Sequence, residues 1–310
     1  MHIEWTGATE YPQDNKARGF KVQDDRRKGL LITVSGVLVI TPDSLLVRLI
    51  SADEWTILFW RGLLSSIAIL LVLAVLQRRR FLPGLLAIGR MGLGLAVMFS
   101  IGTVFFILSL ETTTVANTLF IVSTAPVFAA IMSRLFLREA VSRRTLLTIA
   151  VTLIGVLIIA GGSVGGGPGS LFGDLAALVT AVSVAGTFTI ARHSRPISMV
   201  PAMGISGLVT ALIATVVSPP VALSQADAAY LAAMGLVVIP LSFSLMTIGP
   251  RYLPAPEVSL ILLLEAVLAP LLIWLVLQEY PGNASLLGGA IVLGALFLAN
   301  LASFYERPRR

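Results

Sequence analysis

The chain has too few charged residues to cover a water-facing surface. Only 12% of its 310 residues are charged and 56% are apolar, whereas a soluble domain carries about 25% charged residues. The mean hydropathy is +0.93 and the isoelectric point is about 10.2. That basic value reflects only 22 basic against 16 acidic residues. A soluble enzyme and a nucleic-acid-binding protein are therefore excluded.

Cysteine is absent and histidine is nearly so. The lack of cysteine excludes disulfides, zinc–thiolate sites and thiol catalysis. The two histidines are His2, in the polar tail, and His193, in a basic loop. No histidine triad or metal cluster can therefore form inside a membrane, and we predict no metal, no cofactor and no enzymatic activity. No nucleotide-binding loop is present either, which excludes direct drive by ATP in this chain.

Long apolar stretches divide the chain into candidate membrane spans. Crossing a bilayer takes about 20 mostly apolar helical residues, and these runs lack the short alternating segments of a transmembrane barrel. We therefore predict an all-α integral membrane protein with ten transmembrane helices. The predicted spans lie near residues 29–50, 55–77, 87–109, 112–135, 144–162, 172–191, 199–219, 226–248, 256–277 and 283–304.

The basic residues predict the orientation. Twenty of the 22 lysines and arginines fall on one side of these spans, and the positive-inside rule makes that side the cytoplasm. The predicted opposite loops carry only acidic charges, at Asp53, Glu54, Glu111, Asp174, Asp227 and Glu279. We expect an inner-membrane protein with both termini in the cytoplasm. Its first 28 residues are predicted to be a cytoplasmic tail and not a signal peptide.

The two halves of the chain resemble each other at an offset of 140 residues. Leu137-Arg138-Glu139 then meets Leu277-Gln278-Glu279. Five spans separate the copies, so the repeat is predicted to be inverted in the membrane, an arrangement typical of secondary transporters. The predicted organisation is a tail at 1–28, a repeat at 29–162, a Gly-rich periplasmic linker at 163–171, a repeat at 172–304 and a tail at 305–310.

Short motifs carry a resemblance to a known family. Ser123-Thr-Ala-Pro126-Val followed by Glu139, and Glu265-Ala266-Val267 followed by Glu279, resemble the helix 4 and helix 9 signatures of the EamA-type branch of the drug/metabolite transporter superfamily. Arg61 also matches a common arginine of that family. Ala266 stands where the family usually has proline. The resemblance implies an inner-membrane carrier, usually an exporter of amino acids, metabolites or drugs.

Charged residues within the spans are costly, at least about 2.5–3.5 kcal/mol for Arg or Asp at the helix centre. Asp43 lies about 21 Å above the inner boundary and Arg61 about 9 Å below the outer one, from the helical rise. In a core about 30 Å thick these depths agree, so we predict an Asp43–Arg61 ion pair. The pair either locks the first two spans together or has a direct gating or substrate role.

The first span is predicted to be kinked and to line the transport path. Pro42 removes a helical hydrogen bond just before Asp43, and non-helical backbone at membrane depth is tolerated beside protein or a cavity. Thr41, Asp43 and Ser44 are therefore expected to line the path. Arg48, at the outer end of the span, is expected to snorkel to water and to have no function.

Glu265 is the deepest charge, nine residues into the ninth span, and no arginine is expected at its level. A carboxyl that can hold or lose a proton at mid-membrane would suit proton-coupled transport. It could equally be a permanently protonated side chain that hydrogen-bonds to a neighbouring helix.

Other residues are weaker candidates. Asn117 and Ser259 are predicted neutral polar contacts of the path, and Pro126 is a predicted kink. Glu139 and Glu279, at span ends, are either structural or gate residues. The glycines expected at close helix contacts are Gly92, Gly94, Gly155, Gly288, Gly289 and Gly294.

The predicted function is secondary transport by alternating access, in the outward direction, of small organic metabolites such as amino acids or amphipathic drugs. The expected partners are this small-molecule substrate and membrane lipid, with no nucleic acid, and the protein is expected to be a monomer or homodimer. The alternative is an intramembrane lipid-modifying enzyme, although no Asp-Asp-x-x-Asp or Gly-x-Ser-x-Gly motif occurs.

Overall fold

A computed structural model describes residues 13–136, 143–164, 170–194, 196–253, 258 and 261–305, with side chains for most of them. Within these ranges all regular secondary structure is helical. The α-helices are α1 (Gln13–Ile40), α2 (Asp43–Leu49), α3 (Glu54–Gln77), α4 (Phe81–Ala87), α5 (Gly89–Thr112), α6 (Val115–Val122), α7 (Ala125–Phe136), α8 (Arg143–Val164), α9 (Leu171–His193), α10 (Val200–Val217), α11 (Gln225–Ala233), α12 (Ile239–Ile248), α14 (Leu263–Leu277) and α15 (Asn283–Tyr305). Three short irregular helical segments are η1 (Arg78–Arg80), η2 (Met234–Val238) and η3 (Gly249–Arg251).

The helices are long and apolar enough for a multi-pass membrane protein. Seven segments among the described residues could cross a bilayer by length and composition: Arg27–Leu49, Glu54–Ala87, Gly89–Thr112, Val115–Phe136, Leu171–His193, Val200–Val217 and Gln225–Arg251. Three shorter apolar helices, Ala150–Gly162, Leu264–Leu277 and Asn283–Ala295, fall within the other three predicted spans. The all-helical membrane fold is thus confirmed, and the count of ten crossings stays a prediction.

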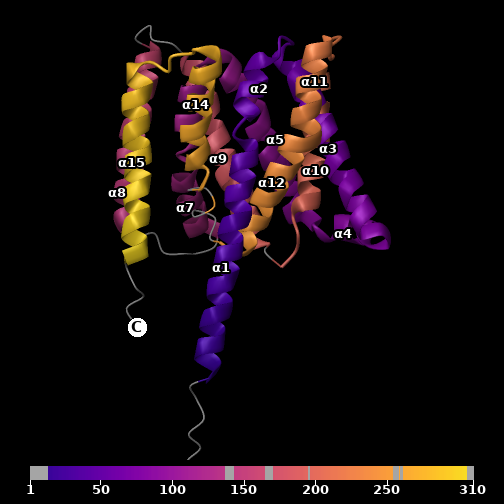
Figure 1. Cartoon of the computed structure of the whole chain (residues 1–310), viewed down its shortest axis with the longest axis vertical. Helices are drawn as coiled ribbons and strands as arrows, with labels where there is room; N and C mark the ends of the chain where they lie inside the picture. Colours follow the sequence, from indigo (N-terminus) through magenta and orange to yellow (C-terminus); the bar gives the residue numbers. More distant parts are fainter. Residues whose placement is uncertain are drawn as a thin grey trace, which may run out of the picture.

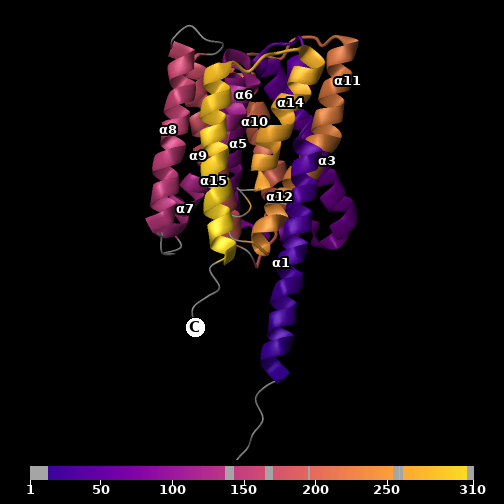
Figure 2. The same ribbon diagram turned by 60° about the vertical axis from the view of Figure 1, so that its left-hand side comes forward.

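The helices of the first half of the chain pack mainly against helices of the second half. The contacting pairs are α1 with α12, α3 with α10, α5 with α9, α6 with α14, and α8 with α15. Figures 1 and 2 show the last pair at one edge of the bundle. If each helix is exchanged for its counterpart in the other half (α1 for α9, α5 for α12), the same set of pairs results. The packing therefore follows a two-repeat pattern.

Two of these contacts are close because glycine occupies both sides. A Cβ atom on Gly207 of α10 would lie 2.5 Å from the carbonyl oxygen of Gly62 in α3. A Cβ atom on Gly288 of α15 would lie 2.5 Å from the carbonyl oxygen of Gly155 in α8. Small residues let helix backbones approach in a membrane, where dispersion and not hydrophobic burial drives association.

The prediction for the other glycines is only partly right. Gly289 packs against the Phe120 ring, as expected of a close helix contact. Gly92 lies beside Ile88 of its own turn, and Gly94 approaches another helix no closer than 3.9 Å. A Cβ atom on Gly294 would meet nothing within 4 Å, so this expectation is wrong.

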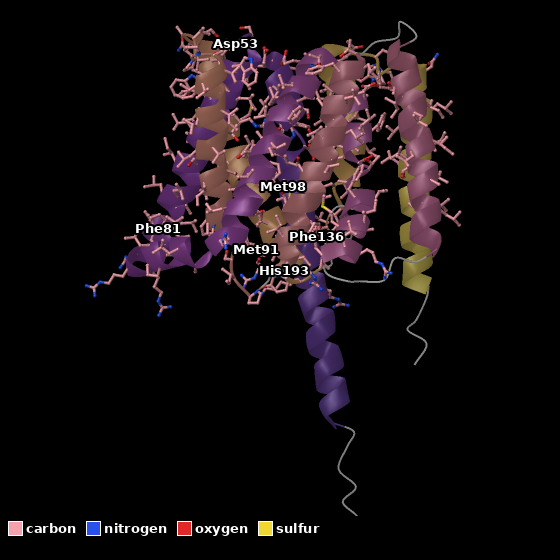
Figure 3. The ribbon with its side chains drawn as sticks, turned by 180° about the vertical axis from the view of Figure 1, so that it is seen from behind. Asp53, Phe81, Met91, Met98, Phe136 and His193 are labelled. Atoms are coloured by element: carbon pink, nitrogen blue, oxygen red, sulfur yellow. The ribbon has the colours of Figure 1, made fainter. Side chains whose placement is uncertain are left out.

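The first and last described helices reach the same end of the bundle. α1 begins, and α15 ends, at the lower end in Figure 1. Figure 3 places Phe81 and His193 toward that end and Asp53 at the opposite one, which we call the Asp53 end. α1 extends beyond the bundle and begins at Gln13. Residues 13–28 are thus helical, a feature that the span prediction from residue 29 did not include.

Four helices that start at the Asp53 end, α3, α6, α9 and α11, begin with a hydrogen-bonding cap. Asp53 accepts hydrogen bonds from the backbone N–H groups of Trp55 (3.1 Å) and Thr56 (3.0 Å) and from the Thr56 hydroxyl (2.7 Å). Partial burial acts to raise the pKa of the Asp53 carboxyl, but these hydrogen bonds outweigh it and lower the pKa below its usual value. The hydroxyl groups that cap α6, α9 and α11 in the same way belong to Thr114, Ser170 and Ser224. Such caps satisfy N–H groups that the helix itself leaves unpaired.

Three spans are interrupted near their middle. α1 ends at Ile40 and α2 begins at Asp43, so the break predicted at Pro42 is present. α6 and α7 are separated at 123–124, directly before Pro126, where a kink was also predicted. Between α11 and α12 the chain forms a π-helical turn, η2, which the sequence did not predict. Such turns occur often at functional sites.

Candidate functional site

A cavity lies between the two halves of the bundle. The space between atoms there, including the part open to solvent, is about 600 Å³. Its walls are formed by α1, α2, α3, α5 and α6 from the first half and by α9, α12 and α14 from the second. Most of its lining is apolar. Among the described residues, three charged side chains reach it, namely Asp43, Arg61 and Glu265.

Asp43 and Arg61 form the predicted ion pair. One terminal guanidinium nitrogen of Arg61 donates to Oδ1 of Asp43 at 2.9 Å, and the other lies 2.9 Å from Oδ2. The Asp43 side chain is 1% exposed and that of Arg61 5%. Such a bidentate pair fixes geometry as well as charge. Asp43 is the first residue of α2, so the interruption at Pro42 directs this carboxylate toward α3.

Arg61 has one further contact and one unsatisfied atom. Its guanidinium lies over the Phe106 ring, 5.9 Å from the centroid, in cation–π geometry. Its Nε is buried and has no hydrogen-bond partner among the described residues. Arg61 is therefore held by Asp43 and by the aromatic face, and it is not fully satisfied in this conformation.

Glu265 faces the same cavity from the first turn of α14. Within the described part of the chain its carboxyl makes no hydrogen bond, and its side chain is only half-buried because it borders the cavity. The charges of Asp43 and Arg61 act on this carboxyl. The expectation that no arginine lies near it is therefore wrong, because α3 brings Arg61 to the same space.

Two other predicted path residues lie beside the cavity and not on its described wall. Thr41 is buried, and its hydroxyl donates back to the carbonyl of Val37 in α1 at 2.9 Å. Ser44 is fully buried, and its hydroxyl has no partner among the described residues. Of the three predicted path residues of the first span, the structure brings only Asp43 to the cavity.

A second, smaller cavity of about 360 Å³ adjoins the first. The two share Arg61, Phe99, Thr103 and Phe243 in their walls. Apart from Arg61, the polar side chains of the second cavity are the hydroxyl groups of Ser65, Thr103, Ser206 and Thr210. The sequence analysis did not identify this space, because these residues come from three helices that only the fold brings together.

Asn117 lies in a polar cluster near the Asp53 end, not on the described cavity wall. Its amide nitrogen donates to Oδ1 of Asp174 at 3.1 Å and to the Thr113 hydroxyl at 3.2 Å. Thr113 also donates to Asp174 at 3.1 Å, and the Ser285 hydroxyl donates to the Asn117 carbonyl oxygen. The cluster thus joins α6 to α9 and α15, across the two halves of the chain.

An ion pair extends this cluster. Nε of Arg48 lies 3.5 Å from Oε2 of Glu279, and the Arg48 guanidinium donates to the Thr113 carbonyl at 2.8 Å. Glu279 also accepts a 3.3 Å hydrogen bond from the Val115 backbone N–H. Arg48 was expected to snorkel to water without a role, but the structure shows it paired across the two halves. We call Arg48, Thr113, Asn117, Asp174, Glu279 and Ser285 the outer network.

A separate contact at the same end joins the halves again. Asp227 of α11 accepts hydrogen bonds from the backbone N–H of Ser51 at 3.0 Å and from its hydroxyl at 2.9 Å. All six acidic residues of the predicted outer loops lie in described segments, and three of them, Asp174, Asp227 and Glu279, form contacts between the halves.

Two predicted site residues cannot be placed. Ser259 and Glu139 lie outside the described residues. Among those that are described, no three carboxylate or imidazole side chains come together as a metal site.

The fold and cavity define a class of protein. The chain is an all-helical, multi-pass membrane protein in which two repeats enclose a central cavity with buried charges, and such sites mark substrate or ion pathways. Residues 28–161 and 171–301 each match the EamA-like transporter family. The chain belongs to this family and is a membrane transporter.

Similar proteins agree with this assignment. The uncharacterized transporter YdfC of Bacillus subtilis (strain 168) is 28% identical over 251 residues, covering 76% of this chain and 78% of that protein. The uncharacterized transporter YetK of the same organism is 24% identical over 309 residues, covering 93% and 91%. A crystal structure with 17% identity has a TM-score of 0.62, covering 88% of this chain and 98% of its own, and supports the fold. These names point to a transporter and away from the alternative of a lipid-modifying enzyme.

Proposed function

We propose that this protein is a secondary transporter that exports small organic metabolites, such as amino acids or amphipathic drugs, across the inner membrane. The observation that carries the proposal is the cavity shared by both repeats, where Asp43, Arg61 and Glu265 meet among apolar side chains. Transporters with inverted repeats place their substrate site between the repeats.

The orientation follows from charge and from the course of the chain. η1, with its three arginines, lies at the end where α1 begins and α15 ends (Figure 1). By the positive-inside rule this end is cytoplasmic, so we infer that both termini are cytoplasmic and that the Asp53 end faces outward. Ten crossings in two inverted repeats of five satisfy this orientation.

Alternating access requires that contacts between the repeats break and re-form. We infer that the outer network is a gate on the outward side, because it links the halves mainly through side-chain contacts and lies at the Asp53 end. Glu279 and Arg48 are its charged members. At the other end, Arg192 of α9 donates to the carbonyls of Pro250 (3.2 Å) and Leu253 (3.4 Å), also in the second half. Opening outward would therefore require the outer network to separate.

Glu265 is our candidate for proton coupling. It faces the cavity without a hydrogen bond in the described part of the chain, and the charged groups that act on it are Asp43 and Arg61. A carboxyl in this position can exchange a proton with whichever side the cavity faces. In the competing role it stays protonated and hydrogen-bonds to a neighbouring helix.

The test is solute flux from proteoliposomes that contain only this protein and a mixture of amino acids and metabolites. Vesicles are compared with and without a pH gradient, for the unaltered chain, Glu265→Gln and the control Glu54→Gln at the outer start of α3. We expect gradient-dependent flux that Glu265→Gln makes independent of the gradient and Glu54→Gln leaves unchanged. Flux that ignores both the gradient and Glu265→Gln would make the protein a facilitator. No flux of any solute would contradict the transporter proposal.

A further inference from the structure

Phenylalanine rings surround the charged part of the cavity. Phe99 and Phe106 come from α5, Phe188 from α9 and Phe243 from α12. Phe99 and Phe243 pack edge-to-face, with ring centroids 4.5 Å apart and planes at 77°. Phe106 already presents its ring to the guanidinium of Arg61 at 5.9 Å. Aromatic faces attract cations, most strongly where water is excluded.

The charges of the cavity are unbalanced. It has two carboxyl groups and one guanidinium among its described lining residues. Asp43 engages both terminal nitrogens of Arg61, and the third nitrogen is enclosed within the protein. The pair is therefore internally neutral, and Glu265 remains without a counter-ion of its own among the described residues. A carboxyl group removed from water needs either a proton or a cationic partner, so the ionised form of Glu265 is best satisfied by a cation in the cavity.

We propose, resting on the transporter function above, that the cavity selects organic monocations whose cationic centre is attached to an aromatic or other apolar body. The cationic centre pairs with Glu265, and the body packs against Phe106, Phe188 and the other rings. An organic anion meets repulsion from Glu265, and the positive charge of Arg61 is already neutralised by Asp43. A zwitterion such as an amino acid has to separate Arg61 from Asp43 before its carboxylate finds a partner. The cavity thus discriminates by charge among solutes of the same shape.

Four probes with one aromatic body test this selectivity on the purified, unaltered chain in detergent. They are trimethyl(2-phenylethyl)ammonium, its uncharged isostere with carbon in place of nitrogen, phenylalanine and 3-phenylpropanoate. Binding is measured by equilibrium dialysis at pH 8. We expect the cation to bind at least about tenfold more tightly than each other probe, the order expected for a desolvated cation–π and ion-pair contact.

Variants assign the effect to residues. Glu265→Gln is expected to weaken binding of the cation about tenfold and to leave the uncharged isostere unchanged. Phe106→Leu keeps apolar volume without the ring face, so it is expected to weaken the cation about threefold or more. Glu54→Gln, an acid outside the cavity, is the control and is expected to change neither. Circular dichroism and gel filtration confirm that each variant is folded.

Several outcomes would overturn the proposal. Tighter binding of phenylalanine would make the site zwitterion-selective, and equal binding of cation and isostere would make it an apolar site that ignores charge. The ranking on the unaltered chain needs no variant, so it stands even if Glu265→Gln does not fold. The transporter function is tested separately. Flux of phenylalanine without binding of the cation would contradict only the proposed substrate class. Binding of the cation without flux of any solute would contradict only the proposed transport.

Discussion

Loss of the Asp43–Arg61 ion pair gives the clearest test of how the first two spans are held together. The change Asp43→Asn leaves the Arg61 guanidinium, 5% exposed, without a carboxylate. Its remaining described contact is the Phe106 ring, which supplies only about 0.5–2 kcal/mol. Breaking a buried ion pair from one side costs about 3–5 kcal/mol. Because the cavity can admit water to Arg61, we expect Asp43→Asn to lower the unfolding free energy by the smaller of these amounts, about 3 kcal/mol.

The double variant separates pairing from other effects. Asp43→Asn with Arg61→Gln leaves two neutral amides and no unpaired charge. We expect it to cost less than Asp43→Asn alone, which gives a coupling energy of at least about 1.5 kcal/mol, within the range for contacting residues. As a control, Glu265→Gln is expected to change stability by less than about 1 kcal/mol, because the carboxyl has no hydrogen bond to lose among the described residues.

The measurement is unfolding of the purified chain by SDS titration in mixed micelles, followed by helical circular dichroism. All four proteins, unaltered, single and double, are compared under one set of conditions. A cost below about 1 kcal/mol for Asp43→Asn, together with additive single changes, would refute the reasoning. Arg61 would then be stabilised by water in the cavity and not by Asp43.

Three further predictions concern other parts of the bundle. Glu279→Gln removes the charge that pairs with Arg48, which should cost only about 0.5–1 kcal/mol of unfolding free energy at this exposure. If the outer network is a gate, an impermeant thiol reagent added outside should label a single cysteine in the cavity wall several-fold faster in this variant than in the chain with Glu279. An unchanged labelling rate would contradict a gate. Gly207→Ala places a Cβ atom 2.5 Å from a carbonyl oxygen of α3, so the unfolding free energy should fall by about 1–3 kcal/mol. Gly294 has open space around it, so the control Gly294→Ala should change the unfolding free energy by less than about 0.5 kcal/mol. The folded-state pKa of Asp53 is lowered, so the stabilisation that its carboxylate gives is present above the unfolded-state pKa and is lost as the pH falls through the folded-state pKa. The difference in melting temperature between the unaltered chain and Asp53→Asn should therefore become smaller on acidification from pH 7 to about pH 3. A difference that is constant with pH would be evidence against this cap.

Features that depend on one helix or on neighbouring helices were predictable. The Asp43–Arg61 pair followed from depth alone, because the rise of a helix is constant and consecutive spans are adjacent in space. The interruptions at Pro42 and Pro126 followed from the missing N–H of proline. These predictions needed no knowledge of how distant helices pack.

Features that depend on the packing of distant segments were not predictable. Glu265 and Arg61 are far apart in sequence, and only the fold brings α14 and α3 to one cavity. Arg48 met Glu279 for the same reason, since no periodicity relates a loop residue to a partner in the other repeat. Gly207 could not be distinguished by sequence from the other glycines, because each is equally small and the facing helix decides which one is in close contact.

The π-helical turn η2 has a consequence for the side chains that follow it. A π turn holds one residue more than an α turn, and each residue of an α-helix rotates the next by about 100°. The side chains of α12, including Phe243 and Met246 on the cavity wall, are thus rotated about the helix axis relative to those of α11 by the angle that one extra residue adds. The number of residues between 234 and 238, and not their chemistry, sets which face of α12 borders the cavity. Deletion of one of them would leave the span apolar and long enough, and would rotate both side chains out of the cavity.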